Sequence, residues 1–118
     1  MAFQSFEDLE VWKRASRLAV TVFQLSKKIK EFALRDQIQR AAISIPSNIA
    51  EGSERGGLDF QRFIRIALGS AAELRTQLYI VLKLDLLPSE SIQPIIKELK
   101  EIAPMLQALS RSRSKAEH

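Results

Sequence analysis

Apolar residues recur at helical spacing in four successive segments, and this periodicity constrains the fold more than any other feature of the sequence. The segments span about residues 7–30, 34–52, 58–84 and 90–110. Spacings of three and four place the apolar side chains of each segment on one helical face, whereas strands need alternation with period two. Short links between long amphipathic helices favour antiparallel neighbours. The sequence therefore predicts an all-α fold in which residues 1–118 form a single-domain, up-down-up-down four-helix bundle.

The helix boundaries carry signals of different quality. A hydroxyl followed by acidic residues resembles a capping signal and predicts a start near Glu7. Residues 27–30 are rich in lysine, which suits the negative end of a helix, so we expect a turn near residues 30–33. The stretch contains no Gly or Pro, so the sequence is also compatible with one longer helix. Gly52 is predicted to end the second helix, with residues 56–57 forming the next turn.

Pro46 interrupts the second segment, in the stretch AISIPSNIAEG. The apolar stripe continues through the proline without a change of phase, so the helix is predicted to continue as well. Proline lacks the amide that would bond the carbonyl of Ala42, and its ring crowds that carbonyl. We therefore predict a kink at Pro46, with Ser44 or Asn48 as the nearest replacement donor.

Two stretches depart from the simple helical pattern. Small side chains occupy residues 69–72 in the middle of the third segment, beginning with Gly69. A helical glycine costs about 1 kcal/mol relative to alanine, so we expect a neighbouring helix to approach closely there. Residues 111–118 form a basic tail outside the apolar pattern, and we predict that this tail is disordered.

The composition excludes most catalytic chemistry. The chain has no cysteine, and its only histidine is the terminal His118. Thiolate nucleophiles and thiolate zinc sites are therefore excluded, and a terminal histidine is a poor general base. Glu51, Glu54 and Asp59 lie around a turn, but they match no calcium-binding loop, and the nearby glycines lack the ending of a phosphate-binding loop. We expect a protein that is not an enzyme and that has no cofactor or metal.

The charge and hydropathy patterns bear on location and partners. Charges interrupt every apolar run before it reaches transmembrane length, and the N-terminus lacks a basic region followed by an apolar one. We therefore expect a cytoplasmic protein without a membrane partner. The net charge of +4 favours weak attraction to polyanions, but the cations are interspersed with acids. Charge alone therefore identifies no partner.

Three motifs resemble those of one protein family. They are FEDLEVW at residues 6–12, QIQRAAISIPSNIAEG at residues 37–52 and FQRFIRIALGSAAEL at residues 60–74. They are similar to the opening, the signature and the third helix of the four-helix-bundle proteins encoded in intervening sequences of bacterial 23S rRNA genes. The likeness covers about residues 6–109. It implies a bundle that assembles as a homopentamer, a suspected association with RNA, and no catalytic residues.

The same family is similar in fold to the accessory proteins of diversity-generating retroelements, which work with a reverse transcriptase and its RNA. That likeness implies an alternative, a protein-interaction scaffold or accessory subunit. The chain departs from the family between the first two helices, where members often carry Phe-Pro and a longer turn but residues 29–33 read IKEFA. The wide apolar arcs of the helices independently favour a homo-oligomer.

Three groups of basic residues are candidate RNA contacts, and each group is equally compatible with an ordinary solvated face. Spacings of three or four residues let members of a group share a helix surface. Modest patches repeated in an oligomer would add through multivalency, giving salt-sensitive binding with little sequence preference. The groups are Lys13, Arg14 and Arg17; Arg55, Arg62 and Arg65; and Arg111, Arg113 and Lys115.

A polar stripe along the second helix is a further candidate site. It contains Gln37, Arg40, Ser44, Ser47 or Asn48, and Glu51. One hypothesis pairs Arg40 with Glu73 of the third helix to fix the register of the bundle, while Ser44 and Asn48 satisfy backbone groups near the proline. The competing hypothesis is that Arg40 contacts RNA.

Overall fold

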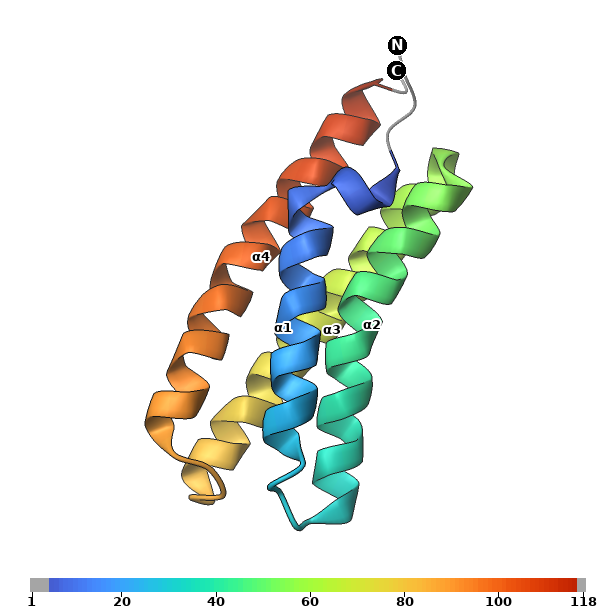
Figure 1. Ribbon diagram of the computed structural model, residues 1–118. Helices are drawn as coiled ribbons and strands as arrows, with labels where there is room; N and C mark the ends of the chain where they lie inside the picture. Colours follow the sequence, from blue (N-terminus) through green and yellow to red (C-terminus); the bar gives the residue numbers. More distant parts are fainter. Residues whose placement is uncertain (1–4, 117–118) are drawn as a thin grey trace.

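The computed structural model describes residues 5–116, and its side chains are described through Arg113. A short 3-10 helix, η1 (Phe6–Asp8), precedes four α-helices, and this described part contains no strand. The helices are α1 (Glu10–Ser26), α2 (Phe32–Arg55), α3 (Gly57–Lys83) and α4 (Ser89–Ala116), shown in Figure 1. The predicted all-α four-helix fold is confirmed.

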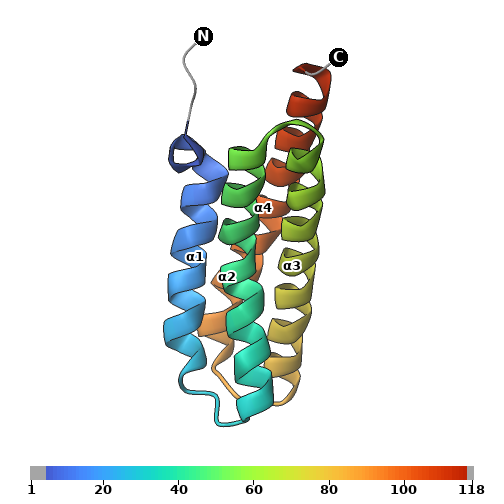
Figure 2. The same ribbon diagram turned by 90° about the vertical axis from the view of Figure 1, so that its right-hand side faces the viewer.

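The four helices lie side by side in an elongated body of 48 × 21 × 20 Å. In Figures 1 and 2 the colour gradient runs in opposite directions along consecutive helices. Each helix packs against its two neighbours, α2 against α3 most extensively and α1 against α4 least, while α1 and α3 lie diagonally opposite. One end of the body therefore holds the α2–α3 turn together with the start of α1 and the C-terminal part of α4 (Figure 1).

The first two helices start and end at different residues than the sequence predicts. The Ser5 hydroxyl accepts a hydrogen bond from the amide of Glu7, but that cap begins η1 rather than α1. Helix α1 ends at Ser26, because the following amides turn back onto carbonyls three residues earlier. The Arg35 guanidinium then donates to the Ile29 carbonyl at 3.0 Å and holds the connection against α2. The turn before α2 therefore spans residues 27–31.

Gly52 does not end the second helix, which corrects the sequence prediction. Helix α2 continues to Arg55, and the chain turns at Gly56, which adopts a positive φ of 67°. A Cβ at Gly52 would lie 2.9 Å from the Cβ of Phe63 and 3.2 Å from the carbonyl oxygen of Phe60. Glycine is therefore needed inside α2 because α3 passes too close for a side chain.

The close approach predicted at Gly69 is wrong. A Cβ added there would meet no atom within 4 Å, and the residue is exposed on α3. The next residue, Ser70, is buried and bonds to Ser44 of α2, so the two helices do pack together in this segment. The contact that leaves no room for a side chain lies instead at Gly52, near the α2–α3 turn.

The predicted disorder of residues 111–118 is also wrong for residues 111–116, which continue α4. Two contacts hold this last part of the helix on the start of α3. The Gln61 amide donates to the Ser110 carbonyl at 3.1 Å, and the Arg113 guanidinium lies 4.4 Å from the centre of the Phe60 ring. Residues 117 and 118, including His118, lie outside the described residues.

The core consists mainly of apolar side chains, and the buried polar residues in the described part of the chain are Ser26, Ser53, Ser70 and Gln77. Phe60, Ile45, Ile49 and other large side chains are fully buried between the helices.

Pro46 lies inside α2, and polar side chains bond to each other close to it. The Asn48 amide donates to both the carbonyl and the hydroxyl of Ser44, each at 2.8 Å. Asn48 thus satisfies a backbone carbonyl near Pro46, but the acceptor is the carbonyl of Ser44 rather than the predicted carbonyl of Ala42. The kink at Pro46 stays a prediction.

A pair of glycine substitutions tests the packing of α2 on α3. We expect Gly52→Ala to lower the free energy of unfolding by about 1–3 kcal/mol, because the new methyl group overlaps the backbone and Cβ of α3. Gly69→Ala is the matched control and should raise it by about 0.5–1 kcal/mol, since the site is open and alanine restricts the unfolded chain. Urea unfolding measures both values. Equal effects of the two substitutions would contradict the assigned contact.

Candidate nucleic-acid interface

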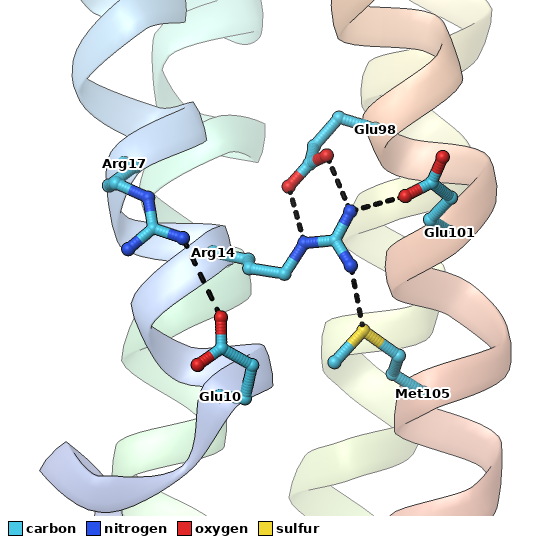
Figure 3. A network of polar contacts seen from close by, with 6 residues as sticks. All are labelled: Glu10, Arg14, Arg17, Glu98, Glu101 and Met105. Atoms are coloured by element: carbon cyan, nitrogen blue, oxygen red, sulfur yellow. Dashed lines mark hydrogen bonds and ion pairs between the residues drawn. The ribbon is translucent and has the colours of Figure 1, made fainter.

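Arg14, one of the predicted RNA contacts, is held in a polar network between α1 and α4 (Figure 3). Its guanidinium donates to both carboxylate oxygens of Glu98, at 2.7 and 2.6 Å, and to Glu101. A third nitrogen lies 3.4 Å from the sulfur of Met105. The Arg14 side chain is only 22% exposed. Its donors are therefore directed at α4, so Arg14 has a structural role, and its contact with RNA stays a prediction.

The electrostatics of this network follow from its hydrogen bonds. The bonds from Arg14 lower the pKa of Glu98 below its ordinary value, against an opposing effect of partial burial. The same bonds to Glu98 and Glu101 raise the pKa of Arg14, so the side chain stays cationic. Bidentate charged bonds of this kind fix geometry as well as adding stability. The network therefore connects α1 to α4 along the least packed boundary of the bundle.

Lys13 and Arg17 remain exposed on α1, beside this network. Arg17 lies 3.7 Å from Glu10, one of the acidic residues at the start of α1 (Figure 3). Helix α1 does not pack against α3, so helix packing does not bring Lys13 or Arg17 next to Arg62 and Arg65 of the second candidate group.

Arg55 and Arg62 meet across the α2–α3 turn. Both guanidinium groups lie over the ring of Phe63, with their central carbons 5.1 and 4.8 Å from the ring centre. The carboxylate of Asp59 lies between them, 3.5 Å from Arg55 and 3.2 Å from Arg62. Arg55 also pairs with Glu51 at 3.1 Å. Two arginines are thereby held in fixed positions on one aromatic ring.

Arginines of the second and third candidate groups lie at the same end of the bundle (Figure 1). The bond from Gln61 to Ser110 brings the C-terminal part of α4 beside the start of α3. Arg65 and Arg111 are exposed there, and neither forms an ion pair with any side chain that the structure describes. The side chain of Lys115 lies outside the described residues. We call this surface the arginine end; its residues are Arg55, Arg62, Arg65, Arg111 and Arg113.

Two aromatic residues of the arginine end were missed by sequence reasoning. Phe63 supports Arg55 and Arg62, and the buried Phe60 supports Arg113. Both phenylalanines look like ordinary core residues in the apolar pattern of α3. The only available signal was the adjacency of Phe63 to Arg62 in the run FQRF.

The predicted polar network along α2 is only partly present. The Arg40–Glu73 ion pair is wrong, because Arg40 bonds at 2.9 Å to Asp36, one turn earlier on its own helix, and its side chain is 79% exposed. Glu73 is exposed on α3. The Ser44 hydroxyl instead bonds to the Ser70 hydroxyl of α3 at 2.8 Å. At this point along the bundle, α2 and α3 are therefore joined by a neutral hydrogen bond rather than by the predicted ion pair.

Glu51, the last residue of the predicted stripe, forms an ion pair within α2. It pairs with Arg55 of the arginine end at the C-terminal end of α2. Within the part of the chain that the structure describes, no group of three or more acidic or histidine side chains is arranged to hold a metal ion. Among the same residues, no helix has both the length and the hydrophobicity to cross a bilayer.

Fold and surface together define a four-helix bundle with an arginine-rich end. The family model for the 23S rRNA-intervening sequence protein matches residues 7–108, and the chain belongs to that family. A solved structure of a protein of unknown function, from the S23 ribosomal protein family of Bacteroides thetaiotaomicron, is similar, with a TM-score of 0.81 and 28% identity. The match covers 85% of this chain and 97% of that one. No curated protein matches the chain.

The Arg14 network makes a testable contribution to stability. We expect Arg14→Met to lower the free energy of unfolding by about 1–3 kcal/mol, because it leaves the partly buried carboxylate of Glu98 and the exposed carboxylate of Glu101 without their donor. Arg40→Met is the control, and its exposed ion pair should contribute no more than about 0.5 kcal/mol. Urea unfolding separates the two. A loss for Arg14→Met no larger than that of the control would contradict the structural role.

The same network predicts a dependence of stability on pH. Because the folded-state pKa of Glu98 lies below its ordinary value of 4.5, its ion pair stabilises the fold above that value. The contribution is lost as the pH falls through the lowered pKa. Melting temperatures measured from pH 7 to pH 3 should therefore fall less steeply for Glu98→Gln than for the wild type. If the melting temperatures of both proteins fall equally steeply between pH 7 and pH 3, Glu98 has no such role.

Proposed function

We propose that this protein binds RNA through the arginine end, largely without sequence preference. The observation that carries the proposal is the gathering of five arginines from α2, α3 and α4 at one end of the bundle, with Arg65 and Arg111 exposed. A guanidinium group matches the geometry of a phosphate and can bind it through two parallel hydrogen bonds. Membership in a family described by 23S rRNA intervening sequences supports an RNA ligand.

The mechanism is electrostatic. Each phosphate that an arginine neutralises releases condensed counterions, so affinity falls with added salt. Arg55 and Arg62 rest on Phe63, and Arg113 rests on Phe60, so these side chains lose little conformational freedom on binding. None of the arginines needs to contact a base. Contacts to phosphates alone position an RNA strand without reading its sequence.

We propose further that the chain acts as a homo-oligomer, a homopentamer by its resemblance to the family. Exposed apolar side chains on α2 and α3 support self-association: Ile43 is 46% exposed, Ile66 43% and Ile80 42%. An assembly would present several arginine ends to one RNA, and its overall affinity would then exceed that of a single arginine end. The same apolar surface favours the second candidate function, a scaffold or accessory subunit that recruits a protein partner such as a reverse transcriptase.

Reversing two charges of the arginine end tests the proposed function. We expect Arg62→Glu with Arg65→Glu to weaken binding of a labelled single-stranded RNA at least tenfold at low salt. The plot of log affinity against log salt concentration should become shallower by about 1.4, which is about 0.7 for each lost phosphate contact. Lys97→Glu with Lys100→Glu is the matched control, because it changes the same charge at the same spacing in the middle of α4.

The control separates local contacts from net charge. Equal losses for both double variants would show that overall charge, and not the arginine end, governs binding. Absence of RNA binding by the wild type at low salt would contradict the proposed function. Salt-insensitive binding of a protein partner, with no RNA affinity, would instead support the scaffold.

A further inference from the structure

Asp59 occupies a position between two cations of the arginine end. Its two carboxylate oxygens are divided between the arginines, with Oδ2 3.5 Å from Arg55 Nη1 and Oδ1 3.2 Å from Arg62 Nη2. Both guanidinium groups stay over Phe63 while they share this carboxylate. The arrangement is one anion bridging two guanidinium groups that come from different helices.

A phosphate is chemically equivalent to the carboxylate in such a bridge. Carboxylate and phosphate oxygens accept the same parallel hydrogen bonds from a guanidinium group. The side chains of Arg55, Arg62 and Asp59 are each about half exposed. Ion pairs at that exposure are weak and screened by solvent, so an incoming phosphate can displace the carboxylate. Phe63 then keeps both arginines in place for the new anion.

Displacement does not remove the negative charge of Asp59. The carboxylate is fixed to the first turn of α3, three residues before Arg62, so it stays close to any phosphate bound there. Like charges at that separation repel. Asp59 thus opposes phosphate binding in two ways, by occupying the donors before binding and by repelling the ligand afterwards.

We propose that Asp59 competes with RNA phosphates for Arg55 and Arg62, and so holds the affinity of the arginine end below what its cations would otherwise provide. This inference rests on the proposed function. Asp59 is in this reading an internal substitute for the ligand, and the ion pairs Arg55–Asp59 and Arg62–Asp59 mark a phosphate-binding site. Arg65 and Arg111, which have no such internal anion in the described residues, make the first contacts with the strand.

The test compares two neutralised aspartates. Asp59→Asn should raise the affinity for a fluorescein-labelled single-stranded RNA about threefold to tenfold, with a salt slope steeper by up to about 1.4 for two gained contacts. Asp36→Asn is the matched control, because Asp36 also pairs with an exposed arginine one turn away, Arg40, and its loss changes the net charge equally. It should raise the affinity less than about twofold and leave the slope unchanged.

Further variants keep the test decisive. Asp59→Ser provides a second neutral side chain in case asparagine disturbs the start of α3, and thermal melting confirms that each variant folds. Adding Arg55→Gln and Arg62→Gln to Asp59→Asn should abolish the gain. Persistence of the gain in that triple variant would overturn the inference, because the effect would not pass through the two arginines.

The outcomes also separate this inference from the function on which it rests. Wild-type binding with equal gains for Asp59→Asn and Asp36→Asn overturns the competition and leaves RNA binding intact. No RNA binding by the wild type, Asp59→Asn or Asp59→Ser overturns both. A gain confined to the two Asp59 variants supports both.

Discussion

The close packing of α2 against α3 at Gly52 is the contact on which the arrangement of the arginine end depends. The missing side chain lets Phe63 and the backbone of Phe60 reach the surface of α2. That approach sets Arg55 and Arg62 over one ring, with Asp59 between them. A bulkier residue would move the two helices apart and separate the arginines. One glycine inside a helix thus determines where charges from two helices meet.

Arginines in this bundle serve different purposes, and their neighbours decide which. Arg14 lies among acceptors on α4 and connects two helices, so its charge is paired with carboxylates of the same chain. Arg40 lies in solvent beside Asp36 and contributes little to stability. Arg65 and Arg111 face solvent without an ion pair in the described residues. A count of basic residues therefore overstates the number of cations that are available to a ligand. The ion-pair partners of each side chain separate the structural cations from the available ones.

The helices themselves could be predicted from the sequence, because burial of one face imposes a period of 3.6 residues that survives even at Pro46. Several helix boundaries could not, and two of them show the reason. Gly52 carries the usual signal of a helix end, yet the close approach of α3 explains it. Residues 111–116 lack an apolar pattern, but packing of Arg113 on Phe60 extends α4. Both depend on contacts between helices that local rules do not contain.

The candidate site was predicted in parts rather than as a whole. Sequence spacing correctly grouped residues within a helix, but the union of two groups at one end depends on the packing of α4 on α3. The Arg40–Glu73 hypothesis failed because a local partner, Asp36, was available at the preferred helical spacing. The structural role of Arg14 was not predicted, because its acceptors are distant in sequence. Long-range pairing is what a single sequence specifies least directly.

The central proposal is that RNA contacts the end of the bundle where α2, α3 and α4 bring their arginines together. Ultraviolet crosslinking of the purified protein to a uridine-rich RNA, followed by mass spectrometry of the crosslinked peptides, tests it most directly. The account predicts crosslinks in peptides that contain Phe63 or the C-terminal part of α4. Crosslinks concentrated instead at Lys27, Lys28 and Lys30, at the opposite end of the bundle, would contradict it.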